Sequence, residues 1–145
     1  LADIYDVLTE LVSLAASKAA ETVFGQNDLA ALSTAIDDMD SALESGDRDE
    51  WSSADDRFHK ELVRLGGNRR IQNIVAMMED QVRRAKKITL HIRPLPLRSN
   101  DDHRALLEAI AAGDGDKTRQ VHRTNRGEAR AVLLEIGEPH GLRHR

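Results

Sequence analysis

The spacing of apolar residues predicts helices along most of the chain. Between about residues 3 and 23 they recur every three or four positions, which places them on one face of a helix. These residues are Ile4, Val7, Leu8, Leu11, Leu14, Ala15 and Ala19. Similar stripes follow the breaks at Gly25, Gly46 and Gly66, and no stretch shows the period-two alternation that predicts a strand.

The second half of the chain continues this pattern. A long apolar stripe begins after Asn68 and stops before Pro94 and Pro96, which cannot continue a helix. A fifth helix is expected to start at Ser99, and a sixth is expected from about residue 116 to 136.

Polar residues at the predicted helix starts support these boundaries. Asn27, Asp47 and Asn68 each precede a stripe, and such side chains accept hydrogen bonds from the first turn of a helix. We therefore expect an all-α fold, an antiparallel bundle of about six helices. Residues 1–137 form one domain in this interpretation, and 138–145 form a frayed C-terminal tail.

Composition narrows the class of protein. The chain has 145 residues and a formal net charge of −4, which argues against a dedicated nucleic-acid-binding domain. It has no cysteine, so any metal must be held by nitrogen and oxygen ligands. No apolar run reaches the roughly 18 residues of a membrane span. We expect a cytoplasmic protein without a membrane partner.

The segment "DDRFH" at residues 55–59 holds the first candidate site. Asp55 and His59 are four residues apart and share one face of a helix. Such a pair can be a surface ion pair that contributes a few tenths of a kcal/mol. Because Phe58 and Leu62 adjoin this face, the pair can also point inward, where a divalent cation would be a suitable partner.

Three later residues are further candidates. His103 begins a helix whose apolar positions must pack in the same bundle, and a hydrogen-bonded core histidine is the alternative interpretation. In the sixth helix, Asn125 falls near the centre of the apolar stripe, whereas His122 falls to one side of it. His122 is the better metal donor, but the helical phase favours Asn125.

At this point the sequence resembles a known family, the FCD (FadR C-terminal) effector-binding domain of GntR-superfamily transcription regulators. The opening "DIYDVLTELVSLAASKAA" is similar to the first helix of that domain. "DDRFHKELVRLGGNRRI" and "NDDHRALLEAIAAGD" match two further family patterns, in family order and spacing. The resemblance covers nearly the whole chain.

The resemblance implies a divalent metal, held by one Asp and three His inside the bundle. Asp55, His59 and His103 fill three of these positions. Ungapped counting puts Asn125 at the fourth, and a three-residue deletion would put His122 there. Zinc, nickel and manganese all suit such ligands, and loss of metal binding is a third alternative.

The resemblance also implies that a small organic acid or similar metabolite binds beside the metal in a central cavity. Arg83, Arg84 and Lys86 are the expected cationic residues for its carboxylate. Solvated side chains with buried stems are the alternative for each of them. The family has an acidic residue in its first helix where this chain has Val12, so the resemblance does not specify what lines that part of the pocket.

The function expected from these features is ligand sensing and homodimerisation within a GntR/FadR-type regulator. Contact with DNA would be made only by an N-terminal winged helix-turn-helix domain, which is absent from these residues. No nucleophile or general-base arrangement is visible, so we do not expect an enzyme. The alternatives are a structural dimerisation module without metal and a helical-bundle metalloenzyme.

Overall fold

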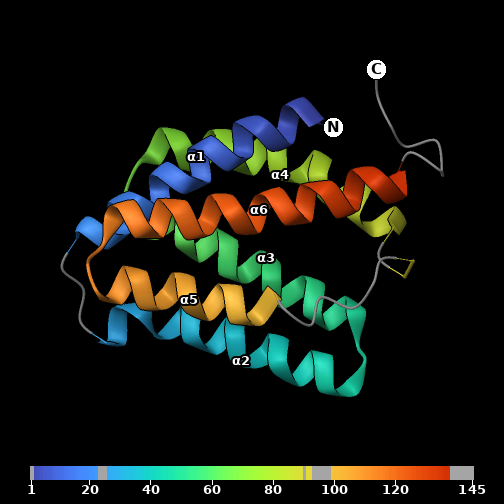
Figure 1. The fold of residues 1–145 in the computed structure, drawn as a ribbon, viewed down its shortest axis with the longest axis horizontal. Coiled ribbons are helices and arrows are strands. Elements are labelled where there is room, and N and C mark those ends of the chain that lie inside the picture. Colours follow the sequence, from blue (N-terminus) through green and yellow to red (C-terminus); the bar gives the residue numbers. More distant parts are fainter. Residues whose placement is uncertain (1, 23–25, 90, 93–98, 138–145) are drawn as a thin grey trace.

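The computed structural model of the chain describes residues 2–22, 26–89, 91–92 and 99–137, and it is all-α, as expected (Figure 1). The predicted tail at 138–145 and the prolines Pro94 and Pro96 lie outside the described residues. The elements are α1 (Ala2–Glu21), the 3₁₀ turn η1 (Gln26–Leu29), α2 (Ala30–Ser45), α3 (Arg48–Leu65), α4 (Arg69–Thr89), α5 (Ser99–Ala111) and α6 (Gly115–Gly137).

Two of the three predicted helix starts are confirmed. The Asp47 side chain accepts a hydrogen bond from the Glu50 amide at 3.0 Å, and Asn68 Oδ1 accepts one from the Ile71 amide at 3.0 Å. The prediction for Asn27 is wrong, because the 3₁₀ turn precedes α2 and its N-cap residue, Leu29, makes no side-chain cap. A tight turn satisfies the first amides there in place of a polar side chain.

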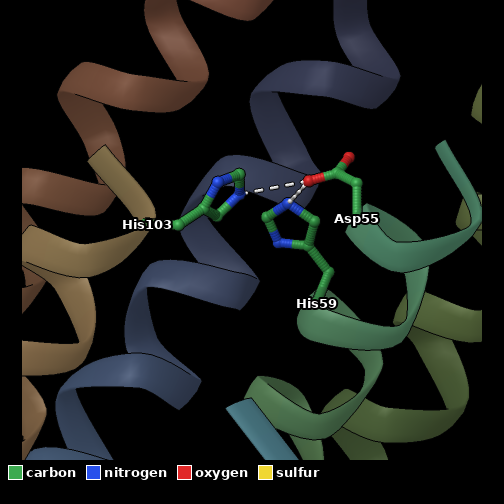
Figure 2. A group of neighbouring side chains, drawn as sticks. All are labelled: Asp55, His59 and His103. Carbon is green, nitrogen blue, oxygen red and sulfur yellow. Dashed lines mark ion pairs between the residues drawn. The ribbon is translucent and has the colours of Figure 1, made fainter. Parts of the chain in front are cut away.

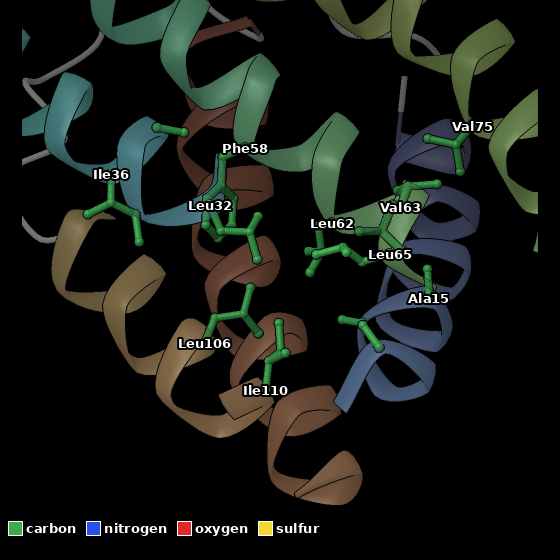
Figure 3. Packing of buried hydrophobic residues seen from close by; sticks show 14 of the residues in the cluster. Ala15, Leu32, Ile36, Phe58, Leu62, Val63, Leu65, Val75, Leu106 and Ile110 are labelled. Carbon is green, nitrogen blue, oxygen red and sulfur yellow. The ribbon is translucent and has the colours of Figure 1, made fainter. Parts of the chain in front are cut away.

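Helix α1 is the centre of the bundle, because it packs on α3, α4, α5 and α6. In Figure 1, α1 and α6 run side by side, while α2 and α5 form the opposite side of the bundle. The core is built from Leu, Ile, Val and Ala with a few larger residues. Figure 3 shows part of this core. Its largest fully buried apolar side chains are Tyr5, Leu8, Val12, Leu32, Ile36, Met39, Phe58, Leu62 and Leu106.

Helix α5 is fixed to α2 by a polar contact at the start of α5. Asn100 donates to Asp40 Oδ1 at 2.5 Å, and Arg104 pairs with the same carboxylate. The hydrogen bond from Arg104 lowers the pKa of Asp40, against the effect of its burial. This contact sets the orientation of α5 and therefore directs His103, one turn from Asn100, into the bundle.

None of the helices in the described part of the chain combines the length and the hydrophobicity that a membrane span requires.

Candidate metal centre

Helix α3 supplies two polar side chains to the interior, one turn apart. Asp55 and His59 are both buried, and His59 Nε2 lies 3.1 Å from Asp55 Oδ1. They share their face of α3 with Phe58 and Leu62, which belong to the core, so packing of that face carries both polar groups inward. The interpretation of Asp55 and His59 as a surface ion pair is therefore excluded.

Helix α5 adds a second imidazole to the same carboxylate. His103 is 1% exposed, and its Nε2 also lies 3.1 Å from Asp55 Oδ1 (Figure 2). Potential ligand atoms of Asp55, His59 and His103 all lie within 4.8 Å of one another. Two helices far apart in sequence thus bring one oxygen and two nitrogen donors to a single point.

Helix α6 buries His122 close to this cluster and leaves Asn125 only partly buried, although the group whose potential ligand atoms meet within 4.8 Å does not include His122. His122 is fully buried and its ring centre lies 6.4 Å from that of His59, whereas Asn125 is only half-buried. Nδ1 of His122 is hydrogen-bonded to Ser13 Oγ at 2.6 Å. Its Nε2 has no hydrogen-bond partner among the described residues.

The sequence misplaced this face of α6 for a physical reason. The described buried residues of the helix are Thr118, His122 and Arg126, four residues apart in each case. They form one polar stripe, so apolar periodicity cannot detect it. A spacing of i, i+4 and i+8 among hydrogen-bonding residues was the signal available.

Phe58 covers the cluster on its apolar side. Its ring meets that of His103 edge-on at 4.6 Å between centres and that of His59 at 5.6 Å. Phe58 is itself fully buried, so it excludes water from this side of the imidazoles.

The carboxylate of the cluster is ionised. Burial by itself would raise the pKa of Asp55, but the charge that His59 carries once it is protonated in acid, hydrogen bonds from His103 and His59, and the charge of Lys86 outweigh it. The pKa of Asp55 is therefore held well below its usual range.

Two imidazoles of this region, those of His59 and His122, are neutral. Burial, together with the positive charge of Arg126, lowers the pKa of His59 to about 4, and the Asp55 charge only partly offsets this. Burial and the Arg126 charge likewise lower the pKa of His122 well below its usual value. Neutral imidazoles beside an ionised carboxylate are the protonation states that metal coordination needs.

The donor set fits a divalent cation. Two ligands that each lie about 2.1 Å from one ion are about 3 Å apart at the right angle of an octahedral site and about 3.4 Å apart at the tetrahedral angle. The two Nε2–Oδ1 separations of 3.1 Å lie within this range. Nδ1 of His59 and Nε2 of His122 are buried without hydrogen-bond partners among the described residues, and such atoms in native proteins usually mark an unfilled role.

The three cationic residues expected from the sequence lie in different surroundings on α4. Lys86 is mostly buried, and its Nζ lies 3.9 Å from Asp55 Oδ2. Arg83 is half-exposed and pairs with Asp56 and Asp80. Arg84 is exposed to solvent.

A groove connects this region with the surface. It has a volume of about 1080 Å³, and α2, α3 and α4 line it. His59, Glu79 and Arg83 are among its lining residues, so one member of the cluster is at its wall. Its volume is large enough for a small metabolite.

Arg126 is the residue near the site that the sequence did not indicate. Only 4% of it is exposed, and its positive charge acts on both His59 and His122. Its Nη2 lies 3.4 Å from Glu79 Oε1, while Nε has no partner among the described residues.

The sequence matches the FCD domain family over residues 3–125, most of its length. The chain belongs to the FCD domain family. This confirms the resemblance to the FCD domain of GntR-superfamily regulators that the sequence shows.

Two further comparisons concern a sequence relative and a solved structure. A protein of Streptomyces ambofaciens, described as an uncharacterized HTH-type transcriptional regulator in an unstable DNA locus, is 31% identical over 90 residues. The matched region covers 62% of this FCD chain but only 37% of that relative. The solved structure of E. coli McbR/YncC superposes with a TM-score of 0.84 at 17% identity, over 92% of this chain and 67% of that one. That likeness supports the fold alone.

Proposed function

We propose that this FCD domain binds a divalent metal through Asp55, His59, His103 and His122. The observation that carries the proposal is the approach of two buried Nε2 atoms to one carboxylate oxygen, each at 3.1 Å. His122 is preferred to Asn125 as the fourth residue, because it is fully buried beside His59 and has a free Nε2. Zinc, nickel and manganese are the candidate ions.

In this proposal the metal anchors a ligand and does not perform catalysis. A bound cation supplies positive charge and open coordination positions to an anionic group. The protein side chains hold the cation, exclude water with Phe58, and leave access from the groove at His59.

The ligand is a small organic acid or a similar metabolite. Lys86 beside Asp55 and Arg83 on the groove wall are placed to attract its carboxylate. Arg84, which is solvent-exposed, would act only on the approach of the ligand. Binding would shift the balance between conformations of the domain by the difference in affinity for them.

The conformational change would be read by a winged helix-turn-helix domain outside these residues, which would make all the DNA contacts. The regulator identity of the Streptomyces relative supports this role. Two copies would be held together so that two DNA-binding domains match the spacing of an operator.

An exposed apolar surface on α1 and α4 supports the homodimer. Val7, Ile74, Met77 and Ile88 are exposed, and α1 packs against α4. Ile74, Met77 and Ile88 lie on one side of α4 at helical spacing. A surface of this kind is typical of a contact between subunits. The molar mass of a Met77→Glu/Ile88→Glu variant, measured by light scattering, should be that of a monomer.

The metal proposal is tested by titrating chelator-treated protein with zinc, nickel and manganese in a calorimeter. We expect one site per chain. Asp55→Asn should weaken binding by more than about 100-fold, beyond what loss of an outer hydrogen-bond partner costs. Asp56→Asn is the matched control, because this neighbouring carboxylate pairs with Arg83 and not with the cluster.

Ligand sensing is tested on the metal-loaded protein by thermal shift with organic acids. A ligand at 100 times its Kd stabilises the folded state by about 2.7 kcal/mol. If no metal binds and no acid raises the melting temperature, the domain is a structural dimerisation module, and the sensor proposal is wrong.

A further inference from the structure

The buried Arg126 has more hydrogen-bonding capacity than its present contact uses. Its side chain is 5% exposed, and its ion pair with Glu79 joins Nη2 to Oε1 at 3.4 Å, a long contact for a charged pair. Nε of Arg126 is buried without a partner among the described residues. Burial of an arginine with an unpaired N–H group costs free energy, unless another group completes its hydrogen bonds.

The two nitrogens concerned form one edge of the guanidinium group. Nε and Nη2 point their N–H groups in the same direction, which is the geometry that receives both oxygens of a carboxylate. Glu79 contacts only Nη2, so it satisfies half of this edge. A carboxylate that approached freely could make both hydrogen bonds.

Glu79 lies between Arg126 and the groove. Glu79 belongs to α4 and lines the groove, as does His59 of the cluster. Arg126 belongs to α6 and is reached through Glu79. An acid that enters the groove therefore meets the Glu79 carboxylate first, and the cation behind it second.

We infer that Glu79 is an internal substitute for the effector, and that the carboxylate of the effector replaces it on Arg126. This inference rests on the proposed function, because it assigns the residue that binds the organic acid. The exchange breaks the ion pair between α4 and α6 and frees Glu79 toward the groove. Helix α4 also carries the apolar surface proposed for the dimer. Loss of the ion pair on α4 would therefore couple effector binding to the arrangement of the two subunits.

The inference is tested by the affinity of metal-loaded protein for acetate and succinate, with acetamide as the uncharged probe. Glu79→Gln removes the internal competitor and should tighten binding of both acids about tenfold. Glu61→Gln is the matched control: it removes the same charge from another glutamate that lines the groove, which pairs with Arg64. Its acid affinity should stay within about twofold of the parent protein.

Arg126→Gln provides the complementary measurement. It should weaken acid binding at least tenfold while one metal still binds per chain. If Arg126→Gln alone does not fold, the double variant Arg126→Gln/Glu79→Gln removes both charges together and should show the same loss. Acetamide binding should be unchanged in every variant, because it carries no charge.

The outcomes separate this inference from the proposed function. Equal acid affinity in the parent, Glu79→Gln and Glu61→Gln proteins would overturn the inference while leaving an acid sensor in place. A lower melting temperature of Glu79→Gln without tighter acid binding would make the pair merely structural, and would overturn it as well. Metal binding with no response to either acid in any variant would overturn both.

Discussion

Ser13 on α1 lies 2.6 Å from His122 on α6, hydroxyl oxygen to Nδ1, and both side chains are buried. If Nδ1 carries the proton and donates it to Ser13, the lone pair of His122 is on Nε2, which has no hydrogen-bond partner among the described residues. Ser13 would then set the tautomer that a metal requires, as outer hydrogen bonds do for histidine ligands.

Loss of the Ser13 hydroxyl should therefore weaken metal binding. We expect Ser13→Ala to reduce the affinity for zinc or nickel about 10- to 100-fold, measured by calorimetry on chelator-treated protein. Ser17→Ala is the control, because Ser17 is also buried on α1, one turn further along. An equal effect of the two substitutions would assign the loss to packing and not to His122.

The fourth ligand position can be decided by a second pair of variants. His122→Gln should reduce metal affinity by more than about 100-fold, because it removes a buried imidazole whose ring centre lies 6.4 Å from that of His59. Asn125→Ala should change the affinity less than about threefold, since Asn125 is only half-buried. The same calorimetric titration checks both, and the reverse order of effects would restore Asn125 as the ligand.

The comparison of His122 with Asn125 also indicates which parts of the fold and of the site are predictable from the sequence. The bundle and most helix boundaries were predictable, because apolar residues at helical spacing must be buried. Asp55, His59 and His103 were identified because they accompany apolar residues and match a family pattern. Their approach to a common point was beyond prediction from spacing, since it depends on how α3 and α5 pack.

The interior face of α6 was not predictable in the same way. Its described buried residues, Thr118, His122 and Arg126, are polar, and polar residues at helical spacing ordinarily indicate a solvated face. What buries them is contact of α6 with α1, α4 and α5, which no local pattern reports. Arg126 and its partner Glu79 were missed for this reason.

The neutral histidines should make the metal-free protein sensitive to mild acid. His59 has a pKa of about 4 when folded, below the usual value of 6.5 that it regains on unfolding. Above pH 6.5 neither state binds the proton, so the stability contribution is complete; between pH 6.5 and 4 only the unfolded chain binds it, and stability is lost.

The loss from one such histidine approaches about 1.4 kcal/mol per pH unit. His122, whose pKa is also lowered, should add to it. Urea unfolding of chelator-treated protein at pH 7 and pH 5 measures the change. His122→Gln should reduce the difference between the two pH values, and a variant with the parent's full pH dependence would show that His122 does not contribute.

The end of α3 meets α1 so closely that a glycine is required. A Cβ atom at Gly66 would lie 2.7 Å from the carbonyl oxygen of Ala15, 2.8 Å from its Cα and 2.9 Å from its Cβ. None of these atoms can move away unless the backbone of α1 moves. The backbone of Gly66 is α-helical at φ −66, so any cost of Gly66→Ala comes from this contact. We expect a loss of about 1–3 kcal/mol in the free energy of unfolding.

Gly127→Ala on α6 is the opposite case, since no atom of a neighbouring element lies within 4 Å of its Cβ position. It should stabilise the protein by about 0.5–1 kcal/mol. Urea unfolding of the two variants checks both signs, and a neutral Gly66→Ala would mean that α1 and α3 can move apart at this point.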